Sequence, residues 1–366
     1  MLSRLIRGCV HVSVLTHSLS VRASVCFLHS PPSPSSPPLS FSSRMSFFYW
    51  LGVATFLFVV GYIVRVLYET FIYKCDLTQF APKTGKGWAV VTGCTSGIGE
   101  GFAIELASRG WNLVLVSRSL DKLTALSTQL RSRSPSIQTI LAVSDATNPS
   151  PSEIQSVVAA LATLPQGDKF KILINNVGVS TEAPVLFGEE TMQEIEAMIA
   201  VNCRYSTLLT RALLPLLQAS KERCAIVNLS SQSAFVHVPY LAVYSSSKSF
   251  NLAFSHALRD ELAASNIEVL ALTPGFVVSA MTRIPKASLE ACDAIVCARA
   301  GLNAIGLRDH CGYWWHHLSI QWSMLVPAFL RGRVALSMMA KAAAKRRKQM
   351  AAEKEKEKAG AGKKKE

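Results

Sequence analysis

The segment around residue 244 carries a tyrosine and a lysine that together could deliver a proton. Tyr244 and Lys248 stand four residues apart in YSSSK, and the run SKSFNLAFSHALRDEL has helical periodicity. Residues at positions i and i+4 share one face of a helix, so we expect the phenol and the ammonium to be neighbours. A nearby cation stabilises a phenolate and lowers the tyrosine pKa from about 10 toward neutrality. Tyr244 could then act as a general acid toward an alkoxide oxygen.

A serine and an asparagine could complete this group. Ser231 precedes Tyr244 by thirteen residues and ends a predicted strand, so its hydroxyl could donate to the same carbonyl oxygen. The adjacent Ser230 is the local alternative. Asn202, on the helix before that strand, could hold a water that feeds protons to Lys248, although a lone asparagine is more often structural.

Upstream, a glycine-rich turn is suited to binding a pyrophosphate. TGCTSGIGE, Thr92 to Glu100, places three glycines between a predicted strand and a predicted helix. Such glycines allow a tight turn and let the backbone approach a pyrophosphate at the helix N-terminus. A purely structural turn is the alternative. The expected cofactor contacts in this turn are Gly93, Thr95, Ser96, Gly97, Ile98 and Gly99.

The end of the second predicted strand bears on which nucleotide would fit. Dinucleotide folds that prefer NAD place an Asp or Glu here for the ribose 2′-hydroxyl. This sequence has Ser117 and Arg118 instead. An arginine can pair with a 2′-phosphate, which a carboxylate would repel. We therefore expect NADP(H) as the cofactor, with an ordinary surface arginine as the alternative.

Polar residues after the third and fourth predicted strands should lie near the same cofactor. Asp145, in VSDATN, could accept a hydrogen bond from the adenine amino group or merely cap the next helix. Asn175, Asn176 and Gly178, in NNVG, end the fourth strand. Their amides could hold neighbouring strand backbone and admit the adenine ribose.

Short β-branched runs alternate with helical stretches between residues 86 and 275. Five of the predicted strands are WAVVTG (88–93), NLVLVS (112–117), KILIN (171–175), CAIVNLS (224–230) and IEVLALTPG (267–275). Their continuous apolar character is typical of strands covered on both faces. The predicted fold is therefore α/β, a Rossmann-type, doubly wound parallel sheet with right-handed crossovers.

An apolar segment precedes this alternation. FFYWLGVATFLFVVGYIV, residues 47–64, carries no charge, and as a helix it spans about 27 Å, close to the bilayer core. We expect a transmembrane helix over 45–68, with a cleaved signal peptide as the alternative. Basic residues on its C-terminal side place the following domain in the cytosol under the positive-inside rule.

The two ends of the chain carry most of its charge. Residues 1–44 contribute +4 and residues 341–366 contribute +7 of the formal net charge of +14. Basic tails argue against a nucleic-acid-binding domain and for contact with an anionic membrane surface. Residues 1–44 are expected to be a disordered extension or a gene-model artefact before Met45, with an organellar transit peptide as the alternative. Nine scattered Cys without a CxxC pair predict neither a disulfide framework nor a metal site.

Together these motifs resemble the short-chain dehydrogenase/reductase family. TGxxxGIG, NNxG, the helical asparagine, the SS pair and YxxxK follow that family's order and spacing across roughly residues 86–280. The resemblance implies a catalytic tetrad of Asn202, Ser231, Tyr244 and Lys248. In that tetrad Ser231 and Tyr244 also contact the substrate, while Asn202, Tyr244 and Lys248 also contact the cofactor.

The same resemblance extends to a loop after the last long predicted strand. PGFVVSAMT, residues 274–282, matches the segment that closes over the nicotinamide in that family. The implied contacts are Pro274, Val277 and Ser279, with Thr282 as a further candidate.

A narrower resemblance rests on three further features. The apolar anchor, the segment CGYWWHHLSIQW (311–322) and a dilysine at Lys363 and Lys364 are similar to the endoplasmic-reticulum very-long-chain 3-oxoacyl-CoA reductases, related to 17β-hydroxysteroid dehydrogenase type 12. That resemblance implies NADPH-dependent reduction of a long-chain 3-oxoacyl-CoA in fatty acid elongation. It also implies the endoplasmic reticulum membrane, with the catalytic domain facing the cytosol.

The resemblance further implies partners and leaves two alternatives open. The partners are the lipid bilayer, other elongation enzymes and a second copy of the chain, joined through helices near 190–219 and 241–264. A steroid or retinoid dehydrogenase on the same scaffold is one alternative function. A non-catalytic scaffold in the elongation complex is the other.

The chain departs from common soluble members of that family after residue 285. The usual last strand is hard to find there, and two histidines and a proline interrupt the apolar segment 313–330. We expect a helix that lies at the membrane interface or covers the acyl groove. The expected divisions after the anchor are a reductase domain (84–285), a substrate- or membrane-associated segment (286–340) and a charged tail (341–366).

Overall fold

The computed structural model describes the backbone of residues 41–362 and the side chains of residues 45–352. It divides the chain into one unit ending at Ile63 and a second beginning at Val64. Residues 1–40 and the dilysine lie outside the described residues, so the expectations for them remain predictions.

The first unit contains most of α1 (Phe41–Leu67), which continues as the π-helical turn η1 (Tyr68–Ile72). Met45–Ile72 is the one helix among the described residues that is long and apolar enough to cross a membrane. Its apolar side chains, such as Phe48 and Trp50, are exposed. The helix begins before Met45, so residues 41–44 form its first turn rather than an extended leader.

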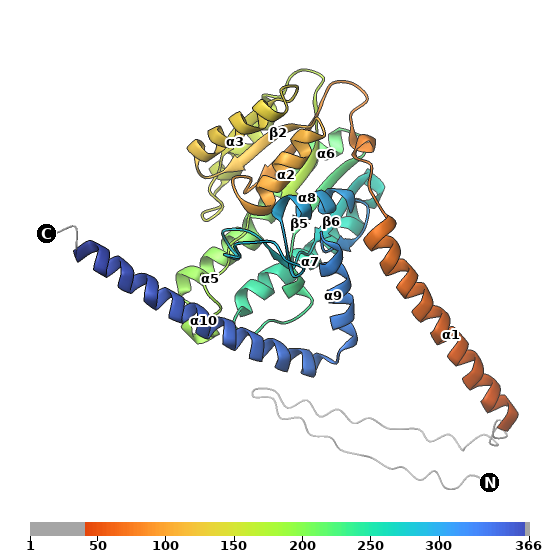
Figure 1. The fold of residues 1–366 in the computed structure, drawn as a ribbon. Coiled ribbons are helices and arrows are strands. Elements are labelled where there is room, and N and C mark those ends of the chain that lie inside the picture. The colour runs from red at the N-terminus through yellow and green to blue at the C-terminus, as the bar shows by residue number, and fades with distance from the viewer. Residues whose placement is uncertain (1–40, 363–366) are drawn as a thin grey trace, which may run out of the picture. The chain divides into compact units, whose positions relative to one another are not determined.

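The second unit is built on one parallel sheet with the strand order β3-β2-β1-β4-β5-β6-β9. Figure 1 labels β2, β5 and β6 of this sheet. Its strands are β1 (Gly87–Thr92), β2 (Asn112–Ser117), β3 (Thr139–Val143), β4 (Lys169–Asn175), β5 (Cys224–Leu229), β6 (Ile267–Leu272) and β9 (Asp309–His310). The chain moves outward from β1 to β3 and then returns to the other side of β1 as β4. Such a reversal opens a crevice at the carboxyl ends of the strands, where ligands of open α/β sheets bind. The predicted doubly wound fold is confirmed.

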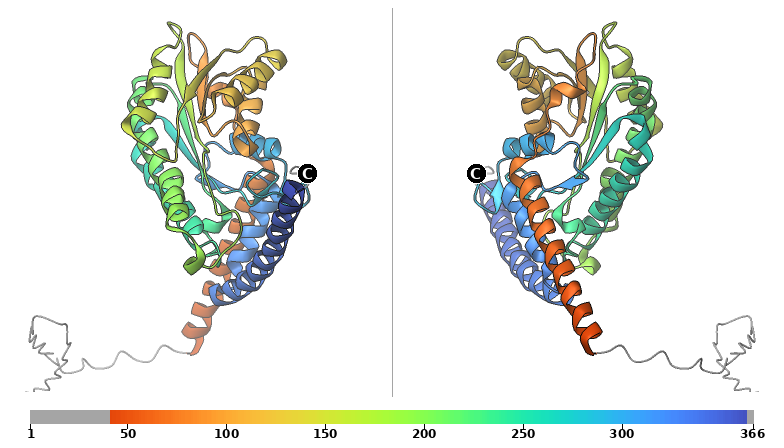
Figure 2. Two further views of the ribbon diagram at one scale, coloured as in Figure 1. Left: turned by 90° about the vertical axis from the view of Figure 1, so that its left-hand side faces the viewer. Right: turned by 90° about the vertical axis from the view of Figure 1, so that its right-hand side faces the viewer.

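Helices cover both faces of this sheet (Figure 2). On one face lie α2 (Gly97–Ser108), α3 (Leu120–Arg133) and α8 (Ala294–Asn303), whose apolar residues share a core with β1 and β2. On the other face lie α4 (Pro151–Ala162), α6 (Ser206–Ala219) and α7 (Ala242–Leu262). Because both faces are covered, β5 is buried along its whole length, as its uninterrupted apolar run predicts.

Local signals explain where several helices begin. Ser150 accepts a hydrogen bond from the amide of Glu153 in front of α4, with Pro151 in the first turn. Thr191 and Glu194 form a capping box at α5 (Met192–Met198). A π-helical turn, η4 (Ile199–Tyr205), then joins α5 to α6. Such bulges are frequent at functional sites, and this one carries Asn202.

The last strand, which is hard to find in the sequence, is present as β9. It pairs with β6 only through Ala271–Asp309 and Leu272–His310. A two-residue strand has no apolar run that could mark it in the sequence. Next to this pairing, the guanidinium of Arg259 donates to the backbone oxygen of Val269 at 3.0 Å.

The C-terminal segment is helical and partly docked. α9 (Trp314–Leu325) buries His316, His317 and Ile320, whereas Trp322 and Leu325 on its later turns are exposed. Pro327 separates α9 from α10 (Ala328–Gly362). A small sheet pairs β7 (Phe276–Val277) with β8 (Ala291–Cys292). Short 3₁₀ turns complete the unit at η2 (Leu77–Phe80), η3 (Phe187–Glu189), η5 (Gln232–Ala234) and η6 (Ala263–Ser265).

Candidate active site

A cavity of about 360 Å³ lies at the carboxyl ends of β1, β4 and β5, where the sheet order reverses. It runs from the glycine turn to the tyrosine–lysine pair. Most of the sequence-predicted site residues line it: Gly93, Thr95, Ser96, Gly97, Ile98, Arg118, Asp145, Asn176, Gly178, Ser231, Tyr244, Lys248, Pro274, Val277 and Ser279. The remaining three, Gly99, Asn175 and Asn202, do not line the cavity.

The glycine turn has the backbone geometry that its sequence predicts. Gly93 and Gly97 have φ values of +61° and +57°, a region that disfavours residues with a side chain. A Cβ on Gly99 would lie 2.3 Å from the backbone oxygen of Gly93, so Gly99 permits the turn to close rather than facing the cavity. The turn leads directly into the N-terminus of α2, whose free amides suit an anion.

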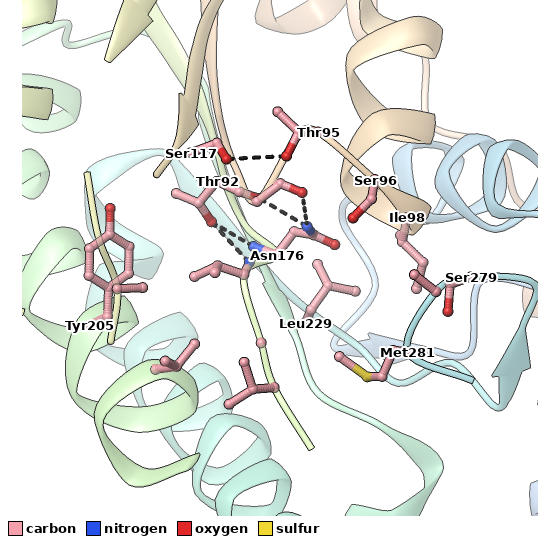
Figure 3. A pocket seen from close by; sticks show the side chains of 18 of the residues that line it. Thr92, Thr95, Ser96, Ile98, Ser117, Asn176, Tyr205, Leu229, Ser279 and Met281 are labelled. Carbon is pink, nitrogen blue, oxygen red and sulfur yellow. Dashed lines mark hydrogen bonds between the residues drawn. The ribbon is translucent and has the colours of Figure 1, made fainter. Parts of the chain in front are cut away.

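Hydrogen bonds tie this turn to the ends of the neighbouring strands (Figure 3). The side chain of Asn176 donates to the backbone oxygens of Thr92 and Gly93 at 2.9 and 3.2 Å. The hydroxyl of Thr92 accepts from the backbone amides of Asn176 and Val177. Thr92 is a positioning residue that the sequence reasoning missed, although its place directly before the first glycine was a usable signal.

Asn175 makes side-chain hydrogen bonds to two neighbouring elements. Its side chain donates to Thr210 and Asn228, both at 2.8 Å, and it is buried on the far side of β4 from the cavity lining. Through these bonds Asn175 joins β4 to α6 and β5. The cofactor contact expected of Asn175 remains a prediction.

Lys248 is buried deep in the tetrad end of the cavity. Its side chain is 4% exposed, and its ammonium donates to the backbone oxygen of Leu229 at 3.0 Å. Burial lowers the pKa of Lys248 to about 8, because a desolvated ammonium is unfavourable. Nζ lies 5.8 Å from the centre of the Tyr244 ring, on the same face of α7 as the sequence predicts.

Tyr244 lies in the same part of the cavity, where its hydroxyl meets Ser231. Desolvation raises the pKa of Tyr244, and the hydrogen bond with Ser231 acts in the opposite direction. This upward direction is opposite to the predicted one; the Lys248 ammonium donates to the oxygen of Leu229 and lies 5.8 Å from the centre of the phenol ring. Tyr244 is therefore held as a neutral phenol, the form in which a general acid must start.

The two adjacent serines have different hydrogen-bond partners in the structure. Ser230 donates to the backbone oxygen of Lys248 at 2.6 Å and thereby fastens β5 to α7. Ser231 accepts a hydrogen bond from the amide of Ser233 at 3.2 Å. Its hydroxyl also meets the Tyr244 phenol in the cavity, whereas the proton of Ser230 is given to backbone, so Ser231 rather than Ser230 is the candidate donor to a carbonyl oxygen.

Asn202 is buried behind the cavity on the π-helical turn. Its side-chain oxygen accepts from the amide of Val179, and its nitrogen donates to the oxygen of Val179 and to Ser247, all within 2.9 Å. A Cβ on Gly178 would lie 3.2 Å from the Lys248 ammonium and 3.3 Å from the Asn202 oxygen. Gly178 thus leaves the space in which Asn202 and Lys248 approach each other. The proton-relay water of Asn202 remains a prediction.

The end of the cavity opposite the tyrosine–lysine pair carries positive charge, which could bind a phosphate on a nucleotide ribose. Arg118 is exposed and makes no ion pair with a described side chain. Lys122, in the first turn of α3, also lines this end, although the sequence reasoning overlooked it. Both side chains line the cavity beside Ser117, the last residue of β2.

Asp145 lines the same end, but it does not cap a helix. Its carboxylate accepts from the amide and the hydroxyl of Thr147, at 3.0 and 2.9 Å. The cap of the next helix is Ser150, so the capping alternative for Asp145 is wrong. The adenine contact remains a prediction.

The loop after β6 closes the tetrad end. Thr282 donates to the backbone oxygen of Val277 at 2.6 Å, and its amide donates to Ser279 at 3.3 Å. Met281 and Val179 add apolar lining that the sequence reasoning did not identify. The glycine cradle, the free cations at one end and the polar loop at the other fit a nicotinamide dinucleotide.

Comparison with known proteins supports this geometry. The chain matches the family model described as short chain dehydrogenase over residues 87–288. A Podospora anserina protein named very-long-chain 3-oxoacyl-CoA reductase is 33% identical over 265 residues, 71% of this chain and 76% of that protein. A Caenorhabditis elegans protein with a corresponding name is 33% identical over 276 residues, 74% of this chain and 86% of that protein.

Two solved structures have the same fold. One is a short-chain dehydrogenase from Sphingobium yanoikuyae in complex with NADPH, with TM-score 0.55 and 28% identity, covering 65% of this chain and 92% of that chain. The other is a 3-ketoacyl-(acyl-carrier-protein) reductase from Brucella melitensis complexed with NADH, with TM-score 0.53 and 25% identity, covering 62% and 94%. With the tetrad residues, the glycine turn and the family match agreeing over the same region, the chain belongs to the short-chain dehydrogenase family.

Proposed function

We propose that this chain is a membrane-anchored reductase that uses NADPH to convert a very-long-chain 3-oxoacyl-CoA to the 3-hydroxyacyl-CoA during fatty acid elongation. The observation that carries the proposal is the meeting of Ser231, Tyr244 and Lys248 in one cavity with the glycine turn. The names of the relatives from Podospora anserina and Caenorhabditis elegans support the substrate class.

The chemistry assigns one task to each of these side chains. A bound reduced nicotinamide supplies the hydride. Ser231 donates a hydrogen bond to the substrate carbonyl and polarises it. Tyr244, which its raised pKa keeps protonated, gives its proton to the same oxygen. Lys248 then stabilises the phenolate and stays within reach of the nicotinamide ribose, while Asn202 holds the water that returns a proton.

The choice of NADPH over NADH rests on the cations at the adenine end. Arg118 and Lys122 offer two positive charges without a carboxylate where NAD-binding proteins usually place one. A 2′-phosphate in that place would gain charge-assisted hydrogen bonds.

The membrane anchor suits a long acyl substrate. Each buried CH₂ contributes about 0.8 kcal/mol, so such chains leave a bilayer reluctantly. A reductase tethered beside the bilayer, with apolar Met281 and Val179 near its tetrad, could receive the chain without releasing it to water.

The proposed location is the endoplasmic reticulum membrane, with the catalytic unit facing the cytosol. The apolar helix Met45–Ile72 is the anchor, and the dilysine at the C-terminus is the retrieval signal. The proposed partners are the lipid bilayer, other elongation enzymes and a second copy of this chain.

The experiment that tests this function is an assay of membranes containing a Tyr244→Phe variant. With NADPH and 3-oxoacyl-CoAs of graded length, we expect wild-type turnover and a loss of about 10²–10⁴-fold in the variant, the usual contribution of a general acid. Tyr73→Phe is the matched control, because its hydroxyl only binds the backbone oxygen of Ile305. Full activity of Tyr244→Phe would remove this residue from the mechanism.

A steroid dehydrogenase is a second candidate function. A Caenorhabditis elegans relative whose name places it among steroid dehydrogenases is 31% identical over 288 residues. Activity on ketosteroids without activity on acyl-CoA in the same assay would favour this candidate. Nucleotide binding without turnover of either substrate would instead indicate a non-catalytic scaffold.

A further inference from the structure

Gly275 begins the loop that closes the tetrad end of the cavity, and it has almost no free space. Pro274 and Gly275 both line the cavity. A Cβ on Gly275 would lie 2.9 Å from the side-chain oxygen of Gln232 and 2.9 Å from the ring of His316. The loop is therefore enclosed between the turn that follows Ser231 and the first turn of α9.

His316 holds this loop through both of its ring nitrogens. The amide of Gly275 donates to Nδ1 at 3.3 Å, and Nε2 lies 3.0 Å from the backbone oxygen of Glu290. Because Nδ1 accepts, the ring proton must reside on Nε2, which can then donate to Glu290. The side chain is 2% exposed, so neither bond is shared with bulk water. Burial lowers the pKa of His316, which favours this neutral form.

Gln232 connects His316 to the catalytic serine. Its side chain donates to the backbone oxygen of His316 at 2.6 Å, and its own amide donates to the oxygen of Pro274 at 3.0 Å. Gln232 directly follows Ser231 in the chain. One continuous set of hydrogen bonds thus joins the serine turn, the loop after β6 and α9.

We propose that His316 is a positioning residue that fixes the Pro274–Val277 segment, and through Gln232 the Ser231 turn, in the arrangement that receives the nicotinamide. The aromatic segment 311–322 would then stabilise the cofactor site, in addition to forming a helix near the membrane or the acyl chain. The inference rests on the proposed use of a nicotinamide nucleotide but not on the identity of the substrate.

The neighbouring histidine provides a natural control. His317 is equally buried at 2% exposed, but it stacks on His310 with ring centres 4.7 Å apart. Neither of its ring nitrogens makes a hydrogen bond with a described residue. Replacing His317 by Phe keeps a flat ring in place, whereas replacing His316 by Phe removes two hydrogen bonds at nearly the same bulk.

The experiment compares full-length His316→Phe, His317→Phe and wild type in membranes or detergent. We expect His316→Phe to bind NADPH about tenfold more weakly, since an unpaired buried donor typically costs about 1.4 kcal/mol. Binding is read from the change in nicotinamide fluorescence, which requires no acyl substrate. We expect His317→Phe to bind within about twofold of wild type, because the neighbours of its ring, His310 and the Glu69 carboxylate at 4.0 Å, belong to neither loop.

A second readout uses the nucleotide-free protein. Amide hydrogen exchange should be faster for the peptide containing residues 274–278 in His316→Phe and unchanged in His317→Phe. Unchanged affinity and unchanged exchange in His316→Phe would overturn the proposal, and so would equal losses in both variants. If His316→Phe does not fold, Gln232→Leu should show the same two effects. Rapid exchange of the Gly275 amide in wild type would also contradict the hydrogen bond.

Discussion

Lys248 belongs to the proposed catalytic tetrad, and burial of its charge lowers the stability of the folded protein. Its ammonium is buried and has one described hydrogen-bond acceptor, the backbone oxygen of Leu229. Desolvation therefore disfavours the ammonium and lowers the pKa of Lys248 to about 8. Below that pH the charged form is present and opposes folding, whereas the unfolded chain keeps its lysine protonated up to about pH 10.5.

We predict that Lys248→Met stabilises the nucleotide-free protein while abolishing activity. At pH 7 the gain in unfolding free energy should be about 1–3 kcal/mol, because a buried charge is replaced by an apolar chain. The gain should shrink as pH rises from about 8 through 10.5, above which the wild-type lysine is neutral in both states. Denaturant unfolding of both proteins across this pH range measures the difference.

Lys171 supplies the control for this prediction. It is fully buried but paired with Glu222 at 3.1 Å, and the pKa of Glu222 is lowered to about 2 by its lysine partners. Lys171→Met breaks that pair and should destabilise the fold. If Lys248→Met were destabilising to the same extent, the view that its charge opposes folding would be wrong.

Arg118 carries a prediction about the nucleotide. Arg118→Asp should invert the preference for NADPH over NADH, because a carboxylate repels the 2′-phosphate and can accept from a 2′-hydroxyl. Steady-state rates with each nucleotide measure the ratio. Arg133→Asp, with the same charge change at the last turn of α3, should leave the ratio unaltered. An unaltered ratio in Arg118→Asp would assign this residue to the surface.

The sequence predicted individual site residues well where a motif fixed both type and position. The tetrad residues and the glycine turn meet near one cavity, although Asn202 and Gly99 act from behind its lining. The hydrogen bonds of Asn175 to Thr210 and Asn228 could not be predicted, because these partners lie far from it in the sequence. The pKa of Tyr244 was misjudged because spacing along a helix does not reveal that a backbone oxygen engages the lysine first.

At the scale of elements, the close packing of α2 against α8 depends on Gly101. A Cβ on Gly101 of α2 would lie 2.7 Å from the backbone oxygen of Ala294 at the start of α8. Backbone cannot yield as the end of a flexible side chain can, so the two helices require glycine here. These helices stand beside the glycine turn, and α2 begins at Gly97 within it.

Gly101→Ala should lower the unfolding free energy by about 1–3 kcal/mol, the usual cost of an overpacked contact. Thermal or denaturant unfolding of the full-length protein measures the change. Gly188→Ala is the matched substitution, since its Cβ would meet nothing within 4 Å. Equal stability of the two variants would show that α8 can move away without penalty.

The sequence predicted those strands that are long. The five predicted strands were recognisable because burial on both faces demands an uninterrupted apolar run. β9 escaped prediction because two paired residues impose no such demand. The position of segment 313–330 could not be predicted, because histidine is a polar residue type whereas both histidines are buried in α9.

At the scale of the whole molecule, the anchor and the catalytic part are separable. The second unit, from Val64 onward, contains the complete sheet, both core clusters and the cavity. Its folding should therefore not depend on residues 1–63. Exposed apolar side chains such as Trp322 and Phe329 remain in that unit and favour contact with a membrane surface.

Deleting residues 1–63 should yield a protein that still binds NADPH but is released from membranes by alkaline carbonate. The full-length protein should stay in the pellet, because a spanning helix resists this extraction. Centrifugation followed by immunoblotting measures both. Retention of the shortened protein in the pellet would mean that another segment, such as 313–330, is embedded in the bilayer.

The short pairing of β9 with β6 bears on the tendency of the protein to aggregate. Most of the outer edge of β6 has no neighbouring strand, and Arg259 stands there with its guanidinium on the oxygens of Val269 and Leu307. Unpaired strand edges are templates for aggregation, and charged side chains are a common way to blunt them. We therefore expect Arg259→Ala to leave these oxygens unpaired and to raise aggregation of the purified protein, as measured by light scattering.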